Sequence, residues 1–355
     1  MSITKDEILN ALRQIEDPIS KKDIVAADLV RALNIDGTEV RFVMEVAPEH
    51  GAAMEVVRTK AVSVLKALRG VEKANVLLTA HTTPKAPPNL GGAKRAAPTA
   101  PAKIPGIDKI LVVASGKGGV GKSTVASNLA VALAQAGKRI GLLDADIYGP
   151  SQPQMLGLSG HPKSPDGKTI IPMRNHGVTA MSIGLMMKEG EAVIWRGPML
   201  SGALQQMLNQ VEWGALDLLI IDLPPGTGDV QLSLSQKAEI TGAIVVSTPQ
   251  DVALLDARKA LDMFRKTNTP VLGMIENMST HICTNCGHEE HIFGHGGTRA
   301  EAEKLALPFL GEIPLDISIR VAGDAGTPIV AGDPDGKQAK AFRDIAHNLI
   351  NSGAV

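Results

Sequence analysis

The sequence predicts an α/β protein in which a small α/β domain precedes a larger domain with a mostly parallel, doubly wound sheet. Short apolar runs alternate with helical stretches over residues 106–355, and strands joined through helices in this way pair in parallel. A proline- and alanine-rich segment separates this part from a shorter first part. The chain of 355 residues is 44% apolar and 21% charged, which is typical of proteins with a buried core.

Residues 1–81 are expected to form the small α/β domain. Thr4 and Glu7 have the spacing of a capping box, and apolar residues follow them at helical period. Apolar and polar residues alternate over 40–46 as in a strand, residues 52–68 have a helical pattern, and residues 71–78 are again strand-like. This part of the chain carries no evident catalytic group.

Residues 82–105 contain six prolines and only basic charges. Such a segment has little to bury and prefers extended conformations, so it is predicted to be a semi-stiff linker. A basic linker can bind phosphate or lipid, but a solvated tether explains the composition more simply.

The larger domain, residues 106–355, begins with a strand at 110–114, a continuous apolar run of the kind that a buried parallel strand needs. A helix is expected over 122–136, where Gly137 stops it, and four further short strands over 139–143, 218–221, 243–247 and 271–275. Residues 337–350 have an apolar helical face. Burial against the sheet explains that face more simply than contact with a membrane.

A glycine-rich loop between the first strand and the first helix of this domain matches G-x-x-x-x-G-K-[ST], the P-loop signature. The glycines let backbone N–H groups turn toward phosphate oxygens, and the helix N-terminus adds a favourable dipole. Lys122 can reach the β- and γ-phosphates, and the Ser123 hydroxyl can bind Mg²⁺. The predicted nucleotide-binding residues of this loop are Gly116, Lys117, Gly118, Gly119, Val120, Gly121, Lys122, Ser123 and Thr124.

The same glycines also satisfy G-x-G-x-x-G, and Asp144 follows about 20 residues on, so a dinucleotide-binding Rossmann unit is a competing interpretation. A Lys–Ser pair in the first helical turn has no role in that unit. Asp222, a second acid at a strand end, suits a Mg²⁺-dependent nucleotidase and not a dehydrogenase. The P-loop interpretation is therefore preferred.

Acidic residues follow two of the expected strands, at the edge of the sheet where ligands bind in open α/β folds. Asp144 and Asp146 can hold Mg²⁺-bound water or orient the attacking water, although either could instead cap the following turn. Asp222 precedes a loop whose Gly226 could offer its backbone N–H to the γ-phosphate. Lys117, a second lysine in the loop, is either solvated or a charge that stabilises the transition state.

Cys283 and Cys286, the two cysteines of the chain, are spaced C-x-x-C and can place two thiolates on one metal or cluster. Two cysteines are too few for a disulfide framework and indicate a reducing compartment. Four nearby histidines allow a zinc site with two cysteine and two histidine ligands. A [4Fe–4S] cluster needs four thiolates, which a two-fold dimer would supply. From the chemistry both remain open, and a redox pair or unliganded cysteines are weaker alternatives. The four histidines are His281, His288, His291 and His295.

Charge and hydropathy argue against nucleic acid and membrane as partners. The 36 basic and 37 acidic residues leave a formal charge of −1, without the broad positive field of a nucleic-acid-binding protein. No apolar run approaches the roughly 18 residues of a membrane span, and the N-terminus lacks the apolar core of a signal peptide. A soluble, cytoplasmic protein is expected.

Residues 116–124, with the extra Lys117, resemble the deviant Walker A loop of the ATPases related to nitrogenase iron protein and to cell-division and partition ATPases. Within that group the chain resembles the Mrp (ApbC-type) iron–sulfur carrier family. The resemblance covers roughly residues 105–345 and rests on motifs in the right order: 144–151 (DADIYGPS), 195–198 (WRGP), 222–229 (DLPPGTGD) and 276–279 (ENMS) before the cysteine pair.

This resemblance implies a P-loop NTPase fold and a homodimeric ATPase that uses ATP and Mg²⁺. It further implies that the dimer carries a [4Fe–4S] cluster between subunits, bound by Cys283 and Cys286 of each chain, and passes it to apo-proteins. Lys117 would then reach across the dimer and Asp146 would lie near the attacking water. Asp222 would serve the Mg²⁺ side. By the same resemblance, Asn277 would contact the adenine edge.

The first 80 residues resemble the small domain found in iron–sulfur assembly factors. Where relatives often have a cysteine, this chain has Ala-Pro-Glu-His at 47–50, so a docking role toward clients or assembly factors is expected and not a thiol role.

The motifs and the resemblance together predict an ATP-hydrolysing iron–sulfur cluster carrier. The alternative is a zinc-stabilised P-loop ATPase of the partition or positioning class.

Overall fold

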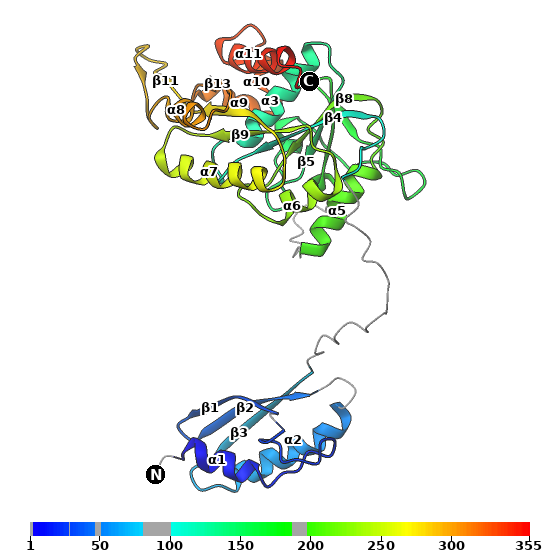
Figure 1. Ribbon diagram of the computed structural model, residues 1–355, viewed down its shortest axis with the longest axis vertical. Coiled ribbons are helices and arrows are strands. Elements are labelled where there is room, and N and C mark those ends of the chain that lie inside the picture. Colours follow the sequence, from blue (N-terminus) through cyan, green and yellow to red (C-terminus); the bar gives the residue numbers. More distant parts are fainter. Residues whose placement is uncertain (1–2, 28, 47–50, 81–100, 187–196) are drawn as a thin grey trace. The chain divides into compact units, whose positions relative to one another are not determined.

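The computed structural model describes residues 3–27, 29–46, 51–80, 101–186 and 197–355 (Figure 1). The chain divides into two compact units, Met1–Ala97 and Pro98–Val355. Most of the predicted linker, the Ala-Pro-Glu-His stretch at 47–50 and Trp195–Arg196 of the WRGP motif lie outside the described residues. The side chains of the rest of that motif, Gly197 and Pro198, are likewise not described.

The first unit is a three-stranded sheet packed against two helices. Its strand order is β1-β2-β3, with β1 antiparallel and β3 parallel to β2. Helix α2 packs on β2 and β3, and α1 packs on α2. The elements are α1 (Lys5–Leu12), β1 (Val30–Asp36), β2 (Glu39–Val46), α2 (Gly51–Lys66) and β3 (Lys73–Ala80).

Local sequence signals account for most of this unit. The Thr4 side chain accepts from the Glu7 N–H while the Glu7 carboxylate accepts from the Thr4 N–H, so the capping box is formed. The alternating apolar residues of β2 are buried. Strand β1 was not predicted, because a bulge shifts its register between Arg31 and Asn34 and Ala32 has a φ of 50°, which breaks the alternation.

The second unit contains an eight-stranded sheet in the order β13-β10-β9-β4-β8-β5-β7-β6. All neighbouring strands are parallel except the edge pair β6–β7. This confirms the mostly parallel sheet. The strands are β4 (Ile107–Ala114), β5 (Ile140–Asp144), β6 (Met173–Asn175), β7 (Val178–Ser182), β8 (Leu216–Asp222), β9 (Gly242–Ser247), β10 (Val271–Asn277) and β13 (Phe309–Ile313).

Helices cover both faces of this sheet, as Figure 1 shows, so it is doubly wound. Along β4, Val112 joins the core under α5 to α8, whereas Val113 joins the core under α3 and α9 to α11. The helices are α3 (Lys122–Gln135), α4 (Gln152–Met155), α5 (Gly197–Asn209), α6 (Asp229–Lys237), α7 (Asp251–Lys266), α8 (Gly297–Lys304), α9 (Ile317–Asp324), α10 (Ile329–Gly332) and α11 (Lys337–Asn351), with a 3₁₀ turn at Ile183–Leu185.

The amphipathic C-terminal stretch forms α11, which packs against α3 and β13. Phe342, Ile345 and Leu349 on its apolar face are at most 1% exposed. Burial in the core therefore accounts for this face, as expected. No helix among the described residues is long and apolar enough to cross a membrane.

The cysteine motif lies on a hairpin that is separate from the main sheet. Strands β11 (His281–Ile282) and β12 (Glu289–Glu290) pair antiparallel with each other. The hairpin follows β10 directly, so the chain passes from the carboxyl end of a parallel strand of the main sheet to the two thiols within a few residues.

Candidate nucleotide and cluster site

The glycine-rich loop joins β4 to α3, the context that the P-loop motif requires. Gly121 has a φ of 79°, and a Cβ there would lie 2.2 Å from the Asn277 side-chain nitrogen. A Cβ on Gly116 would lie 2.0 Å from the backbone carbon of Asp256 in α7. The loop therefore requires glycine at both positions, once for backbone conformation and once for close packing.

Lys122, the first residue of α3, points into the protein and not into solvent. Its Nζ lies 2.5 Å from Oδ1 of Asp222 at the end of β8 and 3.2 Å from Oγ of Ser123. The side chains of Lys122 and Asp222 are 6% and 0% exposed. The structure thus brings three of the predicted site residues together: Lys122 and Asp222 form a buried ion pair, and Ser123 contacts the same ammonium group.

Asp144 ends β5 and is the register partner of Asp222 on β8, so two buried carboxylates stand side by side. Asp144 Oδ2 accepts from the Ser151 N–H and from the Ser182 hydroxyl, and Oδ1 accepts from the Asp146 N–H. Burial, followed by the nearby charge of Asp222, raises the pKa of Asp144 to about 7. A carboxyl group with such a pKa can hold or release a proton near neutral pH.

Gln152 is a site residue that the sequence did not reveal. Its side-chain nitrogen donates to Asp222 Oδ2 (2.8 Å) and to the Ser123 carbonyl (3.0 Å), and its backbone N–H donates to Asp144 Oδ2 (3.1 Å). Its Oε1 is buried without a hydrogen-bond partner among the described residues. A glutamine close to two prolines gives no signal of burial, so only the fold identifies it as the residue that joins the phosphate loop to both acids.

Asp146 is half-buried and lines a second part of the site. Burial raises its pKa, which the charge of Lys122 opposes. It lines a cavity of about 580 Å³ together with Pro225 and Gly228 of the loop after β8. The Gly226 N–H donates to the Ser115 carbonyl at 2.9 Å, so it is not free in this structure, and its contact with a γ-phosphate stays a prediction.

Lys117 is partly exposed, and its side chain forms no ion pair within the described parts of the chain. Its carbonyl accepts from the Ser115 hydroxyl at 2.9 Å, which fixes the backbone of the loop. The ammonium group is therefore available to a phosphate or to another subunit, and its role in the transition state stays a prediction.

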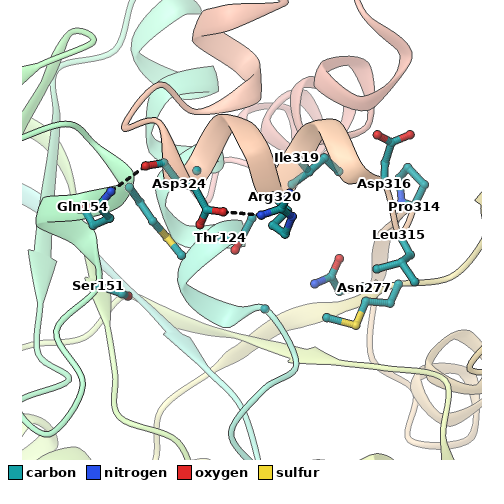
Figure 2. A pocket seen from close by; sticks show the side chains of 14 residues that line it. Thr124, Ser151, Gln154, Asn277, Pro314, Leu315, Asp316, Ile319, Arg320 and Asp324 are labelled. Carbon is teal, nitrogen blue, oxygen red and sulfur yellow. Dashed lines mark hydrogen bonds and ion pairs between the residues drawn. The ribbon is translucent and has the colours of Figure 1, made fainter.

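A pocket of about 360 Å³ opens beside the start of α3, between the end of β10 and helix α9 (Figure 2). Pro314, Leu315 and Ile319 give it apolar walls, while Thr124 marks the side next to the phosphate loop. Asn277 is 6% exposed and donates from Nδ2 to the Val120 carbonyl at 2.8 Å. A pocket with apolar walls next to a phosphate loop suits a nucleotide base, and Asn277 is hydrogen-bonded to that loop.

Backbone hydrogen bonds fix the turn of the cysteine hairpin around its first thiol. The Cys283 N–H donates to the His288 carbonyl, and the Gly287 N–H donates to the Cys283 carbonyl, with Gly287 at a φ of 72°. Backbone N–H groups of Cys286 and Asn285 point at the Cys283 sulfur and lower the pKa of its thiol. Cys286 is exposed. Both thiols are thus accessible, and the turn favours the thiolate form of Cys283.

The histidines do not gather around the cysteines as the zinc alternative requires. Ring nitrogens of His281 and His291 contact the carbonyls of Leu315 and Ser279, and His295 lies beside Glu312. Within the described residues, no group of ligand atoms combines the two thiols with two histidines. The structure therefore does not assemble the predicted Cys₂His₂ set.

Comparisons with known proteins identify the family of the chain. Residues 106–350 match the family described as NUBPL iron-transfer P-loop NTPase, and residues 5–78 match the family described as iron–sulfur cluster assembly protein. The chain is 43% identical over 353 residues to the iron–sulfur cluster carrier protein of Synechocystis, covering 98% of this chain and 97% of that protein. It is 51% identical over 249 residues to the mouse iron–sulfur cluster transfer protein NUBPL, covering 70% and 78%.

Among solved structures, the second unit resembles a nucleotide-binding protein from Archaeoglobus fulgidus in complex with ADP, with 38% identity and a TM-score of 0.58 over 68% of this chain and 94% of that one. The Pyrococcus furiosus cell-division ATPase MinD shares the fold, at 24% identity and a TM-score of 0.51 over 69% and 99%. The resemblance inferred from the motifs is confirmed. The chain belongs to the NUBPL and Mrp family of iron-transfer P-loop NTPases.

Proposed function

We propose that this protein is an ATP-hydrolysing carrier that binds an iron–sulfur cluster through Cys283 and Cys286 and passes it to apo-proteins. The observation that carries the proposal is the continuity of β10. This strand ends at Asn277, which is bonded to the phosphate loop, and the chain reaches Cys283 six residues later. A change in the loop on nucleotide binding or hydrolysis can therefore be transmitted to the thiols through one short segment.

ATP hydrolysis transfers the γ-phosphoryl group to water, giving ADP and phosphate. For this step Lys122 would exchange Asp222 for phosphate oxygens, and Lys117 would add positive charge to the transition state. Asp146, whose pKa is raised by burial, faces the cavity where the attacking water would be oriented. The positions of these groups at the carboxyl ends of β4, β5 and β8 support the assignment.

A magnesium ion fits the donor set at this edge. The Ser123 hydroxyl and the Asp222 carboxylate both contact the ammonium of Lys122, so a hydroxyl and a carboxylate already converge on one cation. Hard oxygen donors of this kind suit Mg²⁺, which would neutralise phosphate charge when bound with ATP.

The cluster is cargo and would be shared between two subunits. Each chain offers two accessible thiols, whereas a thiolate-bound [4Fe–4S] cluster takes four, so a homodimer completes the ligand set. Lys117 on the exposed loop is then available to the partner's nucleotide. We place this cycle in the cytoplasm, with the first unit as the docking domain for clients or assembly factors.

The test is anaerobic reconstitution followed by analysis of iron, sulfide and zinc for the full chain, for Cys283→Ser and for the hairpin control Thr284→Ser. The proposal expects about two iron and two sulfide per chain, lost in Cys283→Ser and kept in the control. One zinc per chain without sulfide, lost in Cys283→Ser, would instead support the zinc-stabilised ATPase. ATPase activity of Asp146→Asn, measured separately, tests the hydrolysis step, which should fall at least about 100-fold.

A further inference from the structure

We infer that Glu276, His295 and Glu312 form a binding site for one divalent transition-metal ion that is distinct from the cysteine pair and from the nucleotide site. One ligand atom from each residue lies within 4.8 Å of the other two. The three residues are separated by up to 36 positions in the sequence, and the parallel pairing of β10 with β13 brings them together.

The two carboxylates are forced close by the sheet. Glu276 on β10 and Glu312 on β13 are register partners in a parallel pair, so their side chains project from the same face. Glu276 is 0% exposed, and its two oxygens accept the N–H groups of Gly296 and Thr298 at the start of α8. Two like charges at this spacing repel each other unless a cation lies between them.

Among the described residues, Glu312 has only a long ion pair with Arg299 and a contact with His295, and Glu276 has no ion pair. Oε2 of Glu312 is buried and forms no hydrogen bond with any described residue. The Arg299 guanidinium stacks on the Phe309 ring, 4.2 Å from its centroid, and stays 4.0 Å from this oxygen. The His295 Nε2 lies 3.3 Å away. An orphaned carboxylate oxygen that faces a ring nitrogen and a second carboxylate has the arrangement of a metal-ligand set.

The donor set selects the class of ion. One imidazole nitrogen with two carboxylates suits borderline first-row ions such as Fe²⁺, Co²⁺ or Zn²⁺ better than Mg²⁺, which prefers oxygen donors and retained water. Ligand atoms that each lie about 2.1 Å from an ion can be no more than about 4.2 Å apart, so the widest pair must close by about 0.6 Å at most. Glu312 and His295 are 39% and 42% exposed, which gives them room to move and gives the ion access.

The site adjoins the base of the cysteine hairpin. The His291 ring stacks on the His295 ring with centroids 4.5 Å apart, and His291 Nδ1 contacts the Ser279 carbonyl at 3.2 Å, across the two ends of the hairpin. An ion that fixes His295 would therefore also fix His291 and the stem that presents the thiols. The inference needs no cluster and does not depend on the proposed carrier function.

The experiment uses the full chain with Cys283→Ser and Cys286→Ser, without nucleotide, so that neither the thiols nor phosphate can bind the probe. Cobalt(II) is titrated by equilibrium dialysis in the presence of excess Mg²⁺. We expect one Co²⁺ per chain, a visible spectrum without thiolate charge transfer, and a raised unfolding temperature of the second unit. Introduced one at a time into this cysteine-free chain, His295→Ala and Glu312→Gln should each weaken Co²⁺ binding at least about tenfold.

His288→Ala is the matched control, because this exposed hairpin histidine lies outside the site. It should change Co²⁺ affinity less than about twofold. Thermal unfolding without metal shows that each variant is folded, and two different ligand substitutions guard against one that misfolds. Absence of bound Co²⁺, or equal binding by the parent, His295→Ala and Glu312→Gln, would overturn the site, as would an equal loss in His288→Ala.

Discussion

Breaking the buried ion pair of Lys122 and Asp222 should destabilise the second unit far more than breaking an exposed ion pair of the same length. The Nζ–Oδ1 distance is 2.5 Å, and the side chains are 6% and 0% exposed. The pair Lys340 and Asp344 on α11 has the same 2.5 Å distance but exposures of 65% and 56%. The Lys340–Asp344 pair therefore serves as an exposed control for the buried Lys122–Asp222 pair.

Removing one charge of the buried pair leaves the other in a site without solvent. We expect Lys122→Met and Asp222→Asn each to lower the free energy of unfolding by about 3–5 kcal/mol. The double variant carries neither charge, and the side-chain carbonyl introduced by Asp222→Asn can still accept from the Gln152 amide. The loss in the double variant should therefore be at least about 3 kcal/mol less than the sum. Lys340→Met should cost less than about 1 kcal/mol.

Urea unfolding without nucleotide, followed by tryptophan fluorescence, measures these energies. Both tryptophans, Trp195 and Trp213, belong to the second unit, so the signal does not report on the first. The reasoning is refuted if the buried substitutions cost no more than Lys340→Met, or if the effects of Lys122→Met and Asp222→Asn simply add.

Three further results are expected. Burial raises the pKa of Asp144 to about 7 from its ordinary 3.8, so the native chain holds a proton there that the unfolded chain has lost. The free energy of unfolding should therefore fall as pH rises between about 4 and 7, by about 4 kcal/mol at most. The urea midpoint should be lower at about pH 8 than at about pH 5 in the parent, and this difference should be smaller in Asp144→Asn. An equal difference in the two proteins would contradict the prediction. Gly121→Ala should weaken ATP binding, measured by calorimetry, more than Gly119→Ala, since both have positive φ but only the first new Cβ meets Asn277; equal losses would remove the steric explanation. Thr4→Ala removes the helix cap and should cost the first unit about 1 kcal/mol by circular dichroism, with an unchanged fluorescence transition for the second unit.

The phosphate loop shows how far local pattern reaches. Its position between β4 and α3 and its glycines could be predicted, because a short segment must itself provide the turn and the N–H groups. The partner of Lys122 could not be predicted, since Asp222 is 100 residues away and becomes its neighbour only through the order of the strands. The same limit hid Gln152, whose contacts all depend on where β5 and β8 lie.

Strand β13 was missed for a related reason. Its sequence, Phe-Leu-Gly-Glu-Ile, has neither a continuous apolar run nor strict alternation, and it becomes a strand because β10 offers it an unpaired edge. This pairing places Glu312 beside Glu276 and so creates the candidate metal site. The C-x-x-C spacing, in contrast, was visible at once, but among the described residues no group of ligand atoms joins the thiols to the histidines near them in sequence.

By itself, the sequence determined the alternation of strands and helices, the phosphate loop, the acids at the strand ends and the thiol pair. Each of these depends on residues a few positions apart, where covalent spacing fixes geometry. The tertiary structure alone decided that Lys122 is buried against Asp222, that burial beside Asp222 raises the pKa of Asp144, and that Glu276, His295 and Glu312 meet. These properties arise from strand order and desolvation, which no local pattern encodes, because they depend on which distant segments exclude water from each other.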